Sequence, residues 1–95
     1  MGRRRFEHLH SELSVAAGRL IPRYALWLHL HGLGRDPENL SREGVLSFAR
    51  GPMEGFLADH GIHLSPRVER RLMRSLERFD PRHDTPSEVM ERLVF

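Results

Sequence analysis

Residues that interrupt helices recur along the chain at Pro22, at Gly32 to Pro37, at Gly51 with Pro52, and at Ser65 with Pro66. Pro lacks a backbone donor, and Gly readily adopts the left-handed conformation that ends helices. The segments between these points are short, and most carry apolar residues at steps of three and four. The pattern predicts an all-α orthogonal bundle of four to six short helices, with no sheet of consequence.

The first two predicted helices meet at Ile21. An apolar stripe predicts the first helix over Phe6 to Leu20, and Pro22 disfavours helical geometry at the residue before it. In the second segment, Arg23 to His31, apolar residues cover most of the helix circumference. A helix of that kind is typical of a position surrounded by neighbours, so we expect the second helix to be central.

The remaining helices are predicted from their start and stop signals. Ser41 is an N-cap for a short helix ending at Gly51, and another short helix covers Pro52 to His60. Ser65 to Phe79 opens with an N-cap and Pro, and Thr85 to Phe95 opens with a capping box. Large apolar residues expected in or near the core are Trp27, Leu30, Phe48, Phe56, Leu72, Leu76 and Phe79.

The composition is typical of one water-soluble domain. The 95 residues are 39% apolar and 29% charged, which suits a single core rather than a disordered chain. Cys is absent, which excludes disulfides and thiolate metal sites and favours a reducing, cytoplasmic location. The richest apolar stretch, Tyr24 to Leu33, is too short to span a membrane, and polar residues interrupt residues 6–20, so we expect no signal peptide.

The strongest functional signal is a set of arginines in the segment from Pro66 to Phe79. A rotation of about 100° per residue gathers them into one stripe, and Val68, Leu72 and Leu76 fall roughly opposite. Such a stripe could bind phosphates or carboxylates by bidentate contacts. A second basic element, residues 1–5, is expected to form a flexible arm. The predicted binding residues are Arg67, Arg70, Arg71, Arg74, Arg78, Arg3, Arg4 and Arg5.

An alternative interpretation of the arginine stripe is a solvated face. Its charges could be balanced by Glu69, Glu77, Asp80 and Asp84. All fifteen basic residues are Arg, which can reflect a GC-rich genome, and the net charge is only +2. The sequence therefore leaves a protein partner and a nucleic-acid partner both open.

Metal binding and catalysis find little support among the seven histidines. His8 with His10, and His29 with His31, lie two residues apart, so they point away from each other on a helix. His60 and His63 flank a Gly and have no defined geometry. No phosphate loop, nucleophile motif or metalloprotease motif is present. We expect a protein that is not an enzyme and needs no metal or cofactor.

Two DNA-binding templates fit poorly. A helix-turn-helix formed by residues 41–60 would place Met53 to Asp59 as its reading helix, which offers no Arg or Asn to the bases. Residues 62–95 distantly resemble the ribbon-helix-helix family through a short alternating segment at Ile62 to Leu64 and two helix starts. They depart from it in strand length, in the connection between the helices and in the length of the final helix.

The C-terminus ends on apolar residues that either pack on the core or form a self-association face in a homodimer. These residues are Met90, Leu93, Val94 and Phe95. Taken together, the sequence predicts a small, non-enzymatic regulatory or accessory protein that acts by binding a macromolecule through its arginine-rich helix face. A protein partner is slightly favoured, and nucleic acid is the alternative.

Overall fold

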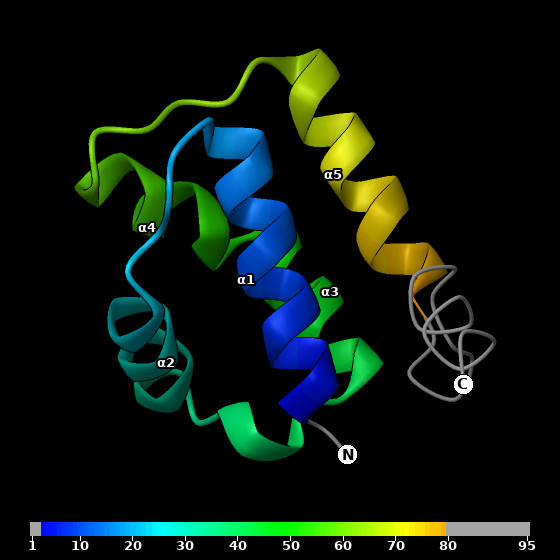
Figure 1. The fold of residues 1–95 in the computed structure, drawn as a ribbon. Coiled ribbons are helices and arrows are strands. Elements are labelled where there is room, and N and C mark those ends of the chain that lie inside the picture. Colours follow the sequence, from blue (N-terminus) through cyan, green and yellow to red (C-terminus); the bar gives the residue numbers. More distant parts are fainter. Residues whose placement is uncertain (1–2, 80–95) are drawn as a thin grey trace, which may run out of the picture.

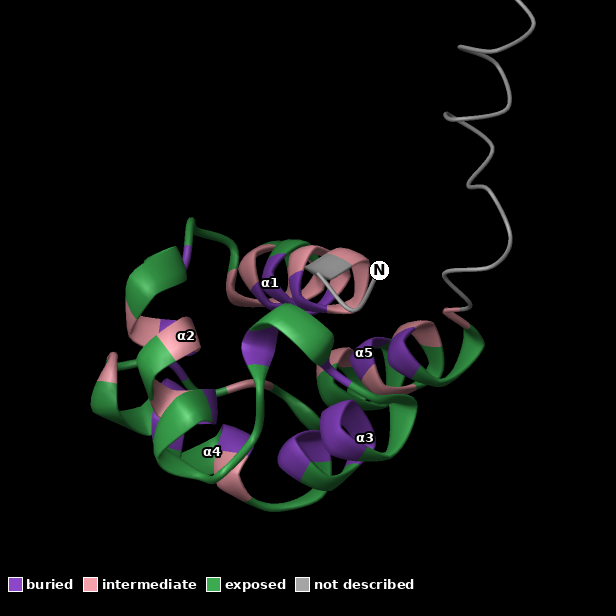
Figure 2. Cartoon of the chain, turned by 90° about the horizontal axis from the view of Figure 1, so that it is seen from below, coloured by how far each residue is buried: buried purple, intermediate pink, exposed green. Residues whose placement is uncertain are grey.

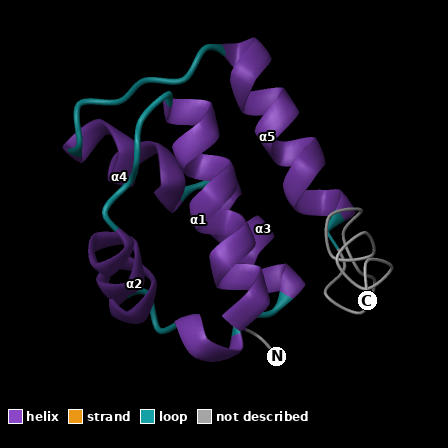
Figure 3. Ribbon diagram, viewed as in Figure 1, coloured by secondary structure: helices purple, strands orange, loops and turns teal. Residues whose placement is uncertain are grey.

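The structure is a computed structural model that describes residues 3–79. Its fold is built from helices joined by short loops (Figures 1 and 3). No strand occurs within that range, so the predicted all-α class is confirmed. The α-helices are α1 (Arg3–Ala17), α2 (Arg23–Gly32), α3 (Arg42–Arg50), α4 (Pro52–Asp59) and α5 (Pro66–Arg78), with a 3-10 turn, η1, at Pro37–Asn39. The predicted helix at residues 85–95 lies outside the described residues.

Local capping explains where these helices begin. The Ser41 hydroxyl accepts a hydrogen bond from the Gly44 N–H at 2.9 Å, and the Ser65 hydroxyl accepts one from the Val68 N–H at 3.3 Å. Each bond satisfies a backbone donor that the first helical turn would otherwise leave without a partner. Both predicted N-caps are therefore confirmed, and Pro52 and Pro66 occupy first-turn positions that need no N–H.

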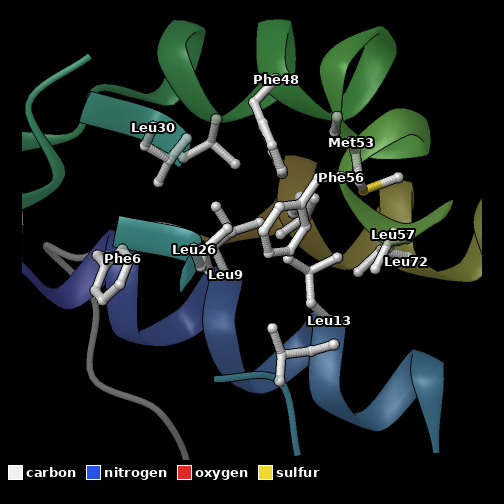
Figure 4. Packing of buried hydrophobic residues seen from close by; sticks show 14 of the residues in the cluster. Phe6, Leu9, Leu13, Leu26, Leu30, Phe48, Met53, Phe56, Leu57 and Leu72 are labelled. Atoms are coloured by element: carbon white, nitrogen blue, oxygen red, sulfur yellow. The ribbon is translucent and has the colours of Figure 1, made fainter. Parts of the chain in front are cut away.

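One hydrophobic core holds all five α-helices together (Figures 2 and 4). Leu9 and Leu13 of α1 are fully buried, and Phe48 and Phe56 meet edge to face with their ring centroids 6.3 Å apart. Of the predicted core residues, five are buried: Leu30, Phe48, Phe56, Leu72 and Leu76. Trp27 packs against the edge of the core, and Phe79 is half-buried against α1.

Helix α1 ends three residues earlier than the predicted end at Leu20. Gly18 has φ of +72°, a left-handed conformation that ends α1 at Ala17, so Leu20 lies outside the helix and is 78% exposed. Ile21 is the joint, as predicted, and is fully buried. Its N–H donates to the Ser14 hydroxyl at 3.1 Å, and its carbonyl accepts from His10 Nε2 at 2.6 Å.

The prediction that the second helix is central is wrong. Helix α2 buries Leu26 and Leu30, whereas Tyr24 is 71% exposed and Leu28 is also exposed. It lies at the edge of the bundle (Figure 1). An apolar sequence alone does not specify which side of a helix its neighbours cover, and here neighbours cover only one.

Helices α1 and α5 are antiparallel neighbours, although they lie far apart in the sequence (Figure 1). The His8 and Phe79 rings stack with centroids 4.0 Å apart and planes 15° apart, which joins the N-terminal half of α1 to the end of α5. Arg3 to Arg5 form the first turn of α1, in place of the flexible arm expected from the sequence. The basic first turn of α1 therefore lies at the end of the bundle where α5 finishes (Figure 1).

Candidate functional site

The candidate site is the exposed side of α5. Its arginine row, Arg67, Arg70, Arg71, Arg74 and Arg78, covers about 100° of the helix circumference at 100° per residue. Leu72 and Leu76 are buried on the opposite side, and the capped start at Ser65 fixes the helix register. Packing of the apolar side therefore turns all five guanidinium groups away from the core.

All five arginines of the row are exposed. Within residues 3–79, none of them forms an ion pair or a side-chain hydrogen bond, and neither Glu69 nor Glu77 pairs with the row. Arginines elsewhere behave differently: Arg23 makes two hydrogen bonds to Glu7, and Arg19 donates to the His60 carbonyl. The charges of the row are thus available to a partner, while Asp80 and Asp84, which could balance them, lie outside the described residues.

The row is unevenly spaced along the helix axis, because Arg70 and Arg71 are adjacent. Its other steps, of three and four residues, correspond to a rise of about 4.5 to 6 Å, and the row extends over about 16 Å from Arg67 to Arg78. Glu77 lies at one edge of the row, and Glu69 lies about 100° around the helix from Arg70, so neither interrupts the row. A row of this kind presents several bidentate donors at the spacing of side chains on one face of another helix.

A shallow polar groove borders the row on its α1 side. His8 and Glu12 line it from α1, with His8 Nε2 at 3.5 Å from Glu12 Oε1. Burial lowers the pKa of His8 from its ordinary value of 6.5, the Glu12 carboxylate opposes that effect, and the nearby Arg5 charge adds to it. His8 is the histidine that the fold places beside the arginine row.

His10, His29 and His60 make contacts within the fold. His10 is buried and donates to the Ile21 carbonyl, and His60 Nδ1 donates to the Phe56 carbonyl at 3.0 Å. A carbonyl can only accept, so those two nitrogens carry protons. His29 lies among the rings of Phe48 and Phe56, where its Nε2 is buried without a hydrogen-bond partner. Within residues 3–79, no group of three His, Asp or Glu side chains is arranged to hold a metal ion.

The two DNA-binding templates gain nothing from the structure. Helix α4 buries Met53, Phe56 and Leu57 and leaves the acidic Glu54 and Asp59 exposed, so its open side would repel a phosphate backbone. Residues 62–64 form a loop rather than a strand. Neither arrangement places a reading element on a basic surface.

Sequence reasoning missed the outer face of α2. The rings of Tyr24, Trp27 and His31 stack in a row, with neighbouring planes 11° and 9° apart. Phe6, Arg23, Tyr24, Trp27 and Glu38 line a cavity of about 500 Å³ beside them. Arg23 lies over the Phe6 ring, 5.8 Å from its centroid. The spacing of Tyr24 and Trp27 was visible in the sequence, but it could not show that Tyr24 is 71% exposed while Trp27 is only partly buried.

Comparison of the chain with protein-family models, with curated proteins and with solved structures finds no match. Within residues 3–79, no helix has the length and apolar character needed to cross a bilayer. The proposed self-association residues Met90, Leu93, Val94 and Phe95 lie outside the described residues. The site is therefore interpreted from its own geometry and charge.

Proposed function

We propose that this protein is a small, non-enzymatic, cytoplasmic regulatory or accessory protein that binds an acidic macromolecule through the arginine row of α5. The observation that carries this proposal is the row itself: five exposed guanidinium groups on one side of a packed helix, without an ion pair among residues 3–79. Guanidinium groups bind carboxylates and phosphates in bidentate geometry, and a fixed helix orders them in advance.

A protein partner is favoured over nucleic acid by two features. Carboxylates at steps of three and four on a partner helix repeat about every 4.5 to 6 Å, which matches the rise from Arg67 to Arg71, Arg74 and Arg78 in turn. At the opposite edge of the bundle from α5 (Figure 1), the exposed and uncharged side chains of α2, including Tyr24 and Leu28, form a second surface, of the apolar and aromatic type found in protein interfaces. Aliphatic side chains such as Leu28 offer little to a phosphate backbone.

Nucleic acid is the second candidate, and one observation favours it. The fold brings the basic first turn of α1 to the same end of the bundle as Arg78, so positive charge continues beyond the row. A continuous basic surface attracts a phosphate backbone through release of its counterions. Arg4 does interact with other groups in the structure, which leaves the row as the larger uncommitted surface.

The test is a fluorescence-anisotropy titration of the full chain with a labelled oligoglutamate peptide, duplex DNA and single-stranded RNA at two salt concentrations. We expect Arg70→Ala with Arg74→Ala to weaken peptide binding about tenfold, because two exposed ion pairs contribute up to roughly 1.4 kcal/mol together. Arg35→Ala with Arg50→Ala removes the same charge elsewhere and is the matched control.

Two results would redirect the proposal. Binding that falls equally in the two double variants would mean that net charge, rather than the row, drives association. Tight binding of DNA or RNA with a salt slope reduced by about 2 in the Arg70 and Arg74 variant would make nucleic acid the partner.

A further inference from the structure

The groove between α1 and α5 holds a mixed set of side chains that the arginine row alone does not explain. Its lining residues are His8 and Glu12 of α1 and Arg71, Ser75, Arg78 and Phe79 of α5, around a volume of about 420 Å³. The stacked rings of His8 and Phe79 lie at the end of the groove where α5 finishes. The groove takes its lining from two helices, whereas the hollow on the other side of the row is lined by α5 residues alone.

Three hydrogen-bond donors of α5 border this groove. Arg71 and Arg78 are seven residues apart, so they lie on nearly the same side of the helix, with a rise of about 10 Å between them. Ser75 lies one turn after Arg71, so along the helix axis it stands between the two arginines, and it also lines the groove. Arg71 and Arg78 are exposed and, within residues 3–79, pair with no acidic side chain. Side chains of this length can converge on a single tetrahedral anion.

The charges around the groove favour a compact dianion. Arg71 and Arg78 supply two positive charges, and Glu12, 3.5 Å from His8, supplies one negative charge. A phosphate monoester carries a charge of about −1.5 to −2 at neutral pH and gains more from the two guanidiniums than a phosphodiester or a carboxylate with a single charge. The Glu12 carboxylate repels any anion in the groove and leaves these three groups with one net positive charge, from which a dianion still gains more than a monoanion.

We propose that the α1–α5 groove binds the phosphate of a phosphorylated serine or threonine in a partner protein, with Arg71, Ser75 and Arg78 as its ligands. This inference rests on the proposed function: the arginine row attracts acidic partners in general, and the groove beside it selects those that carry a phosphate. Clusters of arginine recognise phosphorylated peptides elsewhere by the same bidentate contacts. Phosphorylation of the partner would then switch its affinity for this protein.

The experiment compares two labelled peptides of Ala and Glu that differ only at a central residue, which is phosphoserine in one and Ser in the other. The full chain, Arg71→Gln with Arg78→Gln, and Arg67→Gln with Arg70→Gln are titrated against both by fluorescence anisotropy. The two double variants have the same net charge and change the same helix, but Arg67 and Arg70 do not line the groove. Circular dichroism establishes that both variants fold.

We expect the wild-type chain to bind the phosphoserine peptide at least about tenfold more tightly than the Ser peptide. The Arg71 and Arg78 variant should lose this preference, whereas the Arg67 and Arg70 variant should weaken both peptides and keep the preference. Equal affinity of the wild-type chain for both peptides would overturn the groove proposal and leave the arginine row intact, as would an equal loss of preference in both variants. The titration with the oligoglutamate peptide tests the proposed role of the arginine row separately.

A third arm separates the sources of phosphate. It uses a single-stranded oligonucleotide with and without a 5′-phosphate, and inorganic phosphate as a competitor. Competition by inorganic phosphate for the phosphoserine peptide, without a preference for the 5′-phosphorylated strand, supports the proposal. A preference for the 5′-phosphorylated oligonucleotide that exceeds the preference for the phosphoserine peptide would overturn it in favour of a nucleic-acid end.

Discussion

The joint between α1 and α2 makes a quantitative prediction about a single hydroxyl group. Ile21 is fully buried, and its N–H donates to the Ser14 hydroxyl at 3.1 Å. Ser14→Ala removes the acceptor and leaves a buried donor that water does not reach, which costs about 1 to 3 kcal/mol. Ala favours a helix over Ser by about 0.5 kcal/mol, which offsets part of that cost. We therefore expect a net loss of about 1.5 kcal/mol.

Ser11→Ala is the matched control because Ser11 is exposed on the same helix. Its substitution should leave stability unchanged or raise it slightly through helix propensity. Circular dichroism during urea and thermal unfolding measures both variants. A loss of about 1.5 kcal/mol corresponds to a melting temperature lower by roughly 6 to 12 °C for a domain of this size. If Ser14→Ala and Ser11→Ala melt together, the hydroxyl does not hold the joint.

Two further predictions follow from backbone geometry and from titration. Gly61 has φ of +71° in open space, so Gly61→Ala should lower the free energy of unfolding by about 1 kcal/mol through backbone strain. Gly55→Ala in α4 should raise the free energy of unfolding by a similar amount, because Ala favours the helix over Gly. Equal effects of the two substitutions in urea unfolding would contradict this. Burial lowers the pKa of His8 in the folded chain, so as the pH falls below 6.5 the unfolded chain binds more protons than the folded chain. The wild-type chain should therefore lose stability in that range relative to His8→Gln. Parallel stability curves against pH would exclude that contribution.

Helix starts could be predicted from the sequence because they are local. The Ser41 and Ser65 caps act within three residues, so the sequence around each contains all the groups involved. The end of α1 was harder to place, because Leu20 fits the apolar period of the helix while Gly18 has already turned the chain. A periodic pattern can continue past the point where the backbone leaves the helix.

The candidate site also has one part that the sequence predicted and other parts that it did not. The arginine row depends only on the period of one helix, so the sequence predicted its members and the structure finds all five exposed. The groove beside it needs His8 and Phe79 on one surface, and that depends on how α1 and α5 pair. The exposure of Tyr24 and Leu28 depends on which side of α2 the other described helices cover. Neither property is carried by any single segment.

The pairing of α1 with α5 also determines when the chain can fold during synthesis. The buried Leu9 and Leu13 belong to the first helix, but α5, their neighbour through Leu72 and Leu76, is made last among the described helices. Contacts between distant segments cost loop-closure entropy before they stabilise anything, and they slow folding. Helix α3 and η1, which also contact α1, are made before α5 and can cover part of its apolar side. The part of α1 that faces Leu72 and Leu76 stays uncovered until α5 has left the ribosome.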